Sequence, residues 1–238
     1  MLACIPLTAC GAAAEPTTGT TTVPVTTESQ PSYPEPDKLI ALTFDDGPNE
    51  FMESMLDTFA EYEGKATFFV VGKKIDQKTG EYISCAYNEG HEIGNHSFSH
   101  EDMAPKTDDE VLEEISKTQT LVKDLTGTEP VWYRPPFFSV GPNHHSLIQM
   151  PFAGQAVAAN DGSNDNLAED RHYKIVNGAF DGAVAILHCN SITAEVLPKI
   201  LHDLKMNGYE MVTISELFTR KGVPFEASAD SLYTKACP

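Results

Sequence analysis

Short apolar runs alternate with helical patterns along the chain from Lys38 onward. Short runs rich in β-branched and aromatic residues, bounded by polar or glycine positions, are typical of buried strands. We expect seven such strands, at residues 39–44, 65–72, 91–96, 131–137, 155–160, 183–189 and 209–214.

Helical stretches lie between these strands. The clearest begins with the capping-box signature of Thr107 and Glu110 and ends at Gly127. Others are expected at residues 49–63, up to Gly90, near 168–180 and at 192–206. This alternation predicts an α/β fold with a mainly parallel sheet, and about seven units suit a distorted (β/α) barrel better than a full eightfold one.

Ionisable side chains follow five of the expected strands at their carboxyl ends, where functional residues of such folds gather. They are Asp45 and Asp46, His96 and His100, Arg134, Asp161, and His188. Because the carboxyl ends of parallel strands meet at one edge, we expect these side chains to share one site.

A metal ion would explain how the adjacent carboxylates of Asp45 and Asp46 can lie side by side. His96 and His100 have the i, i+4 spacing that places two imidazoles on one face of a helical turn. With Asp46 they form a set that leaves coordination positions open for water and substrate. We therefore predict a divalent cation, zinc by default with cobalt or nickel also acceptable, and Asp45 as a general base.

Four segments resemble, in order, the signature motifs of the polysaccharide deacetylases, carbohydrate esterase family four. The sequence reads TFDDGP at residues 43–48, HSFSH at 96–100, RPPF at 134–137 and LH at 187–188. The resemblance covers about residues 38–220 and implies a distorted (β/α) barrel that hydrolyses acetyl groups on a polysaccharide.

The resemblance also implies a role for each matching residue. Asp46, His96 and His100 would be the metal ligands, and Asp45 the catalytic base, oriented by Arg134. The backbone N–H of Phe137 would stabilise the oxyanion. His188 would be the general acid, and Leu187 would line the pocket for the acetyl methyl group. Phe138, just beyond the oxyanion turn, is a candidate for stacking on a sugar ring.

The chain departs from the family at the fourth motif, where an Asp followed by Trp is usual. The sequence here is AANDGSNDN, with Gly162 where the Trp would stand. Both Asp161 and Asp165 could hold His188 in its protonated form, and Asp161 is preferred because it directly follows a strand. The missing aromatic residue changes the expected shape of the substrate subsite.

The net charge of the chain restricts the kinds of polymer that it can bind. The 238 residues carry a formal net charge of -19, which argues against nucleic acid, because phosphate binding needs clustered Lys and Arg. An acidic polymer is also disfavoured, whereas a neutral or amino-bearing one is not.

The first residues have a different character. Residues 1–11 end in Leu7-Thr8-Ala9-Cys10-Gly11, which resembles a lipoprotein processing site, although the basic segment of a signal peptide is missing. Residues 12–37 are rich in Thr and Pro and are expected to be a flexible linker. We therefore expect a monomeric, extracellular or cell-surface domain at residues 38–238, reaching the membrane only through a lipid on Cys10. The alternative is a tail that happens to contain two Cys.

The expected activity is deacetylation of an acetylated polysaccharide. O-acetyl groups on xylan are favoured, because RPPFFSV and the absent Trp look more like acetylxylan esterases, and N-acetyl groups on peptidoglycan or chitin are the alternative. A non-catalytic sugar-binding lipoprotein should have lost Asp45, His188 or a metal ligand. A phosphoryl-transfer enzyme would need a glycine-rich phosphate cradle, which the sequence lacks.

Overall fold

Strand β1 (Lys38–Gly47) is the centre of a parallel sheet in the computed structural model, which describes residues 33–162, 167–227 and 232–237. The order of the strands in this sheet is β3 (Glu92–Asn95), β2 (Thr67–Val70), β1, β6 (Ala183–His188) and β5 (Val157–Ala158), with β7 (Tyr209–Val212) also paired to β1.

The length of β1 allows it to pair with three strands. Residues 40–45 pair with β6 along one edge. The other edge is shared, because residues 38–41 pair with β7 and residues 43–47 pair with β2. This arrangement bends the sheet around β1 and begins to close it into a ring.

Short pairings complete the ring. β4 (Phe152–Ala153) pairs with β8 (Leu232–Tyr233), and single bridges join Asn95 to Tyr133, Tyr133 to Phe152 and Ala183 to Lys235. The barrel is therefore distorted, as the sequence predicts. The expected strand at residues 131–137 is reduced to bridges at Tyr133, because Pro135 and Pro136 have no N–H to donate to a ladder.

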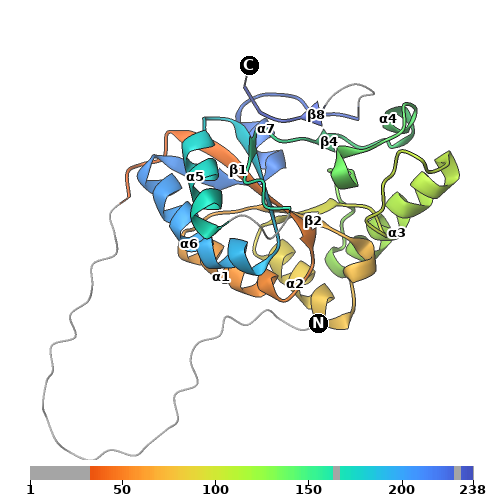
Figure 1. Ribbon diagram of the computed structural model, residues 1–238, viewed down its shortest axis with the longest axis horizontal. Helices are drawn as coiled ribbons and strands as arrows, with labels where there is room; N and C mark the ends of the chain where they lie inside the picture. The colour runs from red at the N-terminus through yellow and green to blue at the C-terminus, as the bar shows by residue number, and fades with distance from the viewer. Residues whose placement is uncertain (1–32, 163–166, 228–231, 238) are drawn as a thin grey trace, which may run out of the picture.

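Alternation along β1 divides the core in two. Ile40, Leu42 and Phe44 face outward into a core cluster that also contains residues of the surrounding helices. Leu39 and Ala41 face into the barrel. The outer layer consists of α1 (Phe51–Glu61), α2 (Gln77–Asn88), α5 (Ala168–Gly178) and α6 (Ser191–Met206), which lie along one side of the sheet in Figure 1.

The other helices lie around the barrel. Helix α3 (Asp108–Thr126) has the expected capping box at Thr107 and Glu110, and Gly127 ends it at φ 79°. Helix α7 (Ile214–Arg220) contributes to the core inside the barrel. The remaining helical segments are η1 (Gly72–Lys74), η2 (Pro136–Phe138) and α4 (His144–Leu147). None of the helices in the described ranges has the length and apolar character needed to cross a bilayer.

Several sequence-based predictions concern residues that the structure does not describe. The leader at residues 1–11, most of the linker at 12–37, the lipid site at Cys10 and the alternative carboxylate Asp165 lie outside the described residues. Within them, Cys189 and Cys237 are free thiols and so form no disulfide with one another.

His91 is a core residue behind the sheet. Its Nδ1 accepts a hydrogen bond from the Ala66 amide at 3.0 Å, and its ring meets the rings of Phe59 and Phe68 edge-on. Burial, with a smaller contribution from the charge of Lys65, lowers the pKa of His91 to about 3. The folded protein therefore holds a neutral imidazole that is protonated far more readily in the unfolded chain.

We expect His91 to lower the stability of the folded protein as the pH falls. Between pH 6.5 and 3 the unfolded chain binds the extra proton, so the free energy of unfolding falls by about 1.4 kcal/mol per pH unit from His91 alone. His91→Asn keeps an acceptor for the Ala66 amide and should lack this component in urea unfolding at pH 7, 6 and 5. His202→Asn, which changes a half-buried histidine of α6 that hydrogen-bonds Tyr33, is the matched control. An unchanged pH slope in His91→Asn would contradict the assignment.

Candidate active site

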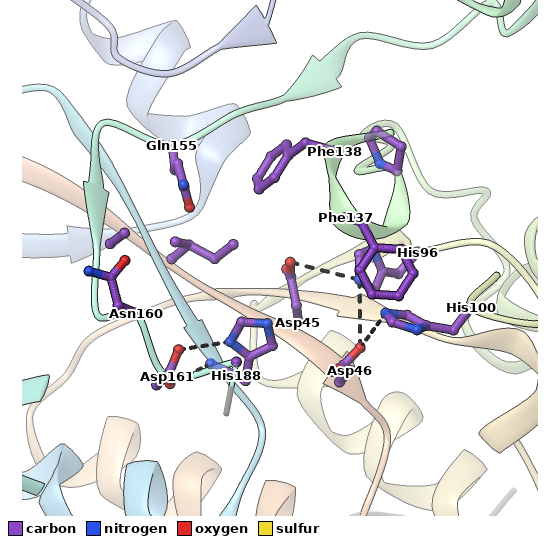
Figure 2. A pocket seen from close by; sticks show the side chains of 14 residues that line it. Asp45, Asp46, His96, His100, Phe137, Phe138, Gln155, Asn160, Asp161 and His188 are labelled. Atoms are coloured by element: carbon purple, nitrogen blue, oxygen red, sulfur yellow. Dashed lines mark hydrogen bonds and ion pairs between the residues drawn. The ribbon is translucent and has the colours of Figure 1, made fainter. Parts of the chain in front are cut away.

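Two adjacent residues at the end of β1 point into the same cavity, against the rule that neighbours in a strand face opposite ways. Asp45 continues the inward series of Leu39 and Ala41, and its side chain is buried. Asp46 has φ 68°, in the left-handed region, and the pairing of β1 with β2 shifts register between Phe44 and Gly47. This irregularity turns the second carboxylate inward beside the first (Figure 2).

Arg134 fixes the position of Asp45. Its guanidinium is fully buried and donates from Nη1 to Asp45 Oδ1 at 2.7 Å and to Thr43 Oγ1 at 2.8 Å. Its other nitrogens donate to the carbonyl oxygens of Ala153 and Gly154, and Phe69 stacks beneath it. Because Oδ1 is occupied, Oδ2 of Asp45 is the oxygen left to accept a proton.

Asp46, His96 and His100 bring three ligand atoms within 4.8 Å of one another. Nδ1 of His96 lies 2.7 Å from the carbonyl oxygen of Arg134. A carbonyl can only accept, so Nδ1 carries the proton and Nε2 offers its lone pair to the site. Burial lowers the pKa of His96, which favours the neutral, ligand-competent imidazole.

The donor set fits a divalent cation. Asp46 Oδ1 is buried and accepts no hydrogen bond from the described residues, although His100 Nε2 is 2.9 Å away and His96 Nε2 3.6 Å away. Burial alone would raise the pKa of Asp46, but His100, His96 and Lys74 outweigh it, so the carboxylate stays ionised. An orphaned carboxylate oxygen beside two imidazole nitrogens is the chemistry that zinc and similar metals bind.

His188 and Asp161 form a second charged pair across the cavity. His188 Nδ1 lies 2.7 Å from Asp161 Oδ1, and the His188 amide donates to Asp161 Oδ2 at 2.9 Å. Burial alone would lower the pKa of His188, but Asp161, aided by the charges of Asp45 and Asp46, raises it above its ordinary value. Nε2 of this imidazole can therefore carry a proton into the cavity near neutral pH.

The turn at η2 presents Phe137 and Phe138 to the cavity, with Phe137 beside His100. Both residues have left-handed backbone angles, φ 57° and φ 53°. The internal hydrogen bonds of this turn are donated by the amides of Phe138 and Ser139, so they do not use the Phe137 amide. The Phe137 ring is 69% exposed and meets His100 edge-on at 5.0 Å between ring centroids.

These aspartates and histidines, with Phe137 and Phe138, line one cavity of about 320 Å³, and Arg134 lies behind Asp45. Other lining residues were not expected from the sequence: Pro135, Gln155, Ala158, Asn160 and Ile186. Ala158 and Ile186 lie in β5 and β6, Gln155 and Asn160 flank β5, and Pro135 lies in the RPPF turn. None of them is ionisable, so they carry none of the charges that mark the strand ends in the sequence. Figure 2 shows Gln155 reaching into the cavity from the segment between β4 and β5.

The predicted position of Leu187 is wrong. Leu187 is fully buried in the core cluster on the helical side of the sheet, with Ala183 and Ala185. Strand alternation places Ile186, two residues before His188, on the barrel side instead, and Ile186 lines the cavity. The apolar residue that lines the cavity next to His188 is therefore Ile186.

A distorted parallel barrel with a buried Asp-Arg pair, an Asp/His/His set and a His-Asp pair at the carboxyl ends of its strands defines a metal-dependent hydrolase class. Residues 32–149 match the polysaccharide deacetylase family. The chain belongs to this family, carbohydrate esterase family four, whose members are metal-dependent.

Individual relatives differ in substrate. The chain is 37% identical over 189 residues to a bifunctional xylanase/deacetylase of Pseudobutyrivibrio xylanivorans, covering 78% of this chain and 31% of that protein. It is 39% identical over 186 residues to a peptidoglycan-N-acetylglucosamine deacetylase of Listeria monocytogenes, covering 77% of this chain and 40% of that protein. The match thus spans less than half of each of these two proteins.

A solved structure matches over nearly its whole length. The family 4 acetyl xylan esterase from Clostridium thermocellum, in complex with a cobalt ion, superposes with a TM-score of 0.79 and 39% identity. The match covers 83% of this chain and 98% of that one.

Proposed function

We propose that this protein hydrolyses O-acetyl esters on a xylan-type polysaccharide. The observation that carries the hydrolytic part is the single cavity that joins a carboxylate base, Asp45, to an imidazolium acid, His188, beside the Asp46, His96 and His100 set. The xylan preference is supported by the similarity to an acetyl xylan esterase and a xylanase/deacetylase.

The base side of the reaction begins at Asp45. Arg134 holds Oδ1, and Oδ2 faces the Nε2 of His96 at 3.8 Å, so the free oxygen is directed toward the metal set. There it can take the proton of a water molecule that attacks the acetyl carbonyl. We propose zinc as the cation held by Asp46, His96 and His100; when bound, it supplies Lewis acidity toward the carbonyl and acidifies water.

The acid side completes the reaction. The Phe137 N–H donates to the oxygen on which negative charge develops. His188 then gives its Nε2 proton to the leaving sugar oxygen as the C–O bond breaks, and Asp161 keeps Nδ1 engaged. Ile186 offers an apolar wall on this side of the cavity.

Removal of N-acetyl groups from peptidoglycan is the second candidate. The observation that favours it is the similarity to the Listeria peptidoglycan-N-acetylglucosamine deacetylase. The same base and acid would serve an amide, although a leaving amine depends on protonation more strongly than a sugar hydroxyl.

An acetate-release panel distinguishes the two candidates. We expect acetate from acetylated xylo-oligosaccharides and none from N-acetylglucosamine oligomers or peptidoglycan fragments. Dialysis against a chelator should abolish release, and zinc should restore it. The reverse substrate order would refute the xylan proposal, and full activity in chelator would refute the metal assignment.

A further inference from the structure

Behind Asp161 lies a buried cation that the reaction outlined above does not use. Arg171, on α5, is fully buried, and its Nη1 lies 3.7 Å from Asp161 Oδ2. In the described part of the chain this is its only carboxylate within ion-pair distance, and its Nε and Nη2 donate no hydrogen bond there. A buried guanidinium destabilises the fold unless an anion compensates its charge, and Asp161 is the anion that compensates Arg171.

The hydrogen bonds between these residues have a defined direction. Arg171 Nη1 donates to Thr193 Oγ1 at 2.8 Å and to the side-chain oxygen of Asn190. The Thr193 hydroxyl in turn donates a hydrogen bond to Asp161 Oδ2 at 2.9 Å. Asn190 and Thr193 begin helix α6, where the Asn190 side chain also accepts from the Thr193 amide. The start of α6 therefore links Arg171 to Asp161 through oriented side chains.

In the described part of the chain, Arg171 is the only charged group besides His188 within ion-pair distance of Asp161. The charged groups that face His188 there are Asp161 after β5, Asp45 and Asp46 from β1 and, through Asp161, Arg171 from α5. Once His188 has given its Nε2 proton to the leaving oxygen, Arg171 is the cation that remains beside the buried Asp161 carboxylate.

We propose that Arg171 is a positioning residue for the proton-donating step. It keeps Asp161 ionised and aimed at His188 Nδ1 while His188 transfers its proton to the leaving group. The inference rests on the proposed function, because it concerns the acid half of that reaction. Arg134 behind Asp45 and Arg171 behind Asp161 thus give the base and the acid one buried arginine each.

Leaving-group dependence tests this role. Arg171→Met should lower kcat/KM on an acetylated xylo-oligosaccharide about 10- to 100-fold, because the sugar oxygen needs a proton to depart. On 4-nitrophenyl acetate, whose phenolate leaves without one, we expect a change of less than about 3-fold. The ratio of the two values is the readout, since it does not depend on the fraction of folded protein. Arg171→Lys, which keeps the charge, should restore part of the ratio.

Two controls separate this role from a purely structural one. Lys199→Met removes an exposed pair with Glu169 between the same two helices and should leave the ratio unchanged. If Arg171 acts through Asp161, its effect should largely disappear once Asp161 is Asn. Adding Arg171→Met to Asp161→Asn should therefore lower the ratio by less than about 2-fold relative to Asp161→Asn alone. An unchanged ratio in Arg171→Met, or independent effects in the double variant, would overturn the inference. A wild-type protein that releases acetate from no sugar ester would instead overturn the proposed function and this inference with it.

Discussion

Asp45→Asn is expected to lower kcat for acetate release by about 10³-fold or more, because the amide cannot take a proton from water. The substitution preserves the shape of a side chain that is only 3% exposed, so the metal ligands should keep their places. Zinc binding measured by calorimetry should remain within about 10-fold of the wild type, since Asp45 is not one of the converging ligands. Retention of more than a tenth of the activity would refute the base assignment.

The same substitution should also weaken the fold. Arg134 is fully buried, and Asp45 is the only carboxylate within ion-pair distance of it in the described residues. Leaving one member of a buried pair uncompensated costs about 3–5 kcal/mol. Asp45→Asn combined with Arg134→Met should recover much of this stability in urea unfolding and none of the activity. Glu113→Gln, which breaks an exposed pair with Lys117, is the control and should change stability by less than about 1 kcal/mol.

The double-variant result would also show that the Asp45-Arg134 pair is there for chemistry. An apolar replacement of similar volume is often as stable as a buried ion pair or more so. The buried carboxylate of Asp45 therefore destabilises the fold. Arg134 offsets this through its charge and through hydrogen bonds to Asp45, Thr43, Ala153 and Gly154.

Much of this site could be predicted because its residues follow strands. Alternation and parallel pairing place strand-end residues at one edge, so Asp45, His96, Arg134, Asp161 and His188 were expected together, and the structure places them around one cavity or in contact with its lining. The barrel itself follows from the order of strands and helices. What the sequence does not display is how the barrel closes through single bridges such as that between Ala183 and Lys235.

Asp46 was expected in the site and lies there, but no residue pattern announces the left-handed backbone angle that turns it inward. The errors and omissions also have local physical causes. Leu187 was placed in the cavity because it adjoins His188, whereas alternation assigns adjacent residues to opposite faces. Gln155 begins the strand expected at residues 155–160, but β5 covers only Val157–Ala158, so Gln155 lies in the segment before it. Arg171 appears in the sequence as one charged residue on an amphipathic helix. Only the packing of α5 against α6 reveals that it is buried beside Asp161.

In the Asp161→Asn variant, kcat/KM for a sugar ester is expected to begin falling at a lower pH than in the wild type. The pKa of His188 is raised, so the protonated acid persists above its ordinary titration range, and kcat/KM for a sugar ester falls only as pH rises through that raised value. Without the Asp161 charge, burial pulls the pKa of His188 down, and the alkaline limb should move to lower pH. The loss relative to wild type is therefore expected to be larger at pH 8 than at pH 6.

The leaving group provides the control for this pH effect. Hydrolysis of 4-nitrophenyl acetate does not need a proton from His188, so its alkaline limb should be nearly the same in wild type and Asp161→Asn. Metal loss or partial unfolding at high pH would instead lower the activity on both substrates together. If kcat/KM for the sugar ester falls at the same pH in Asp161→Asn as in the wild type, Asp161 does not hold His188 protonated. It would leave the short contact between their side chains as a structural hydrogen bond.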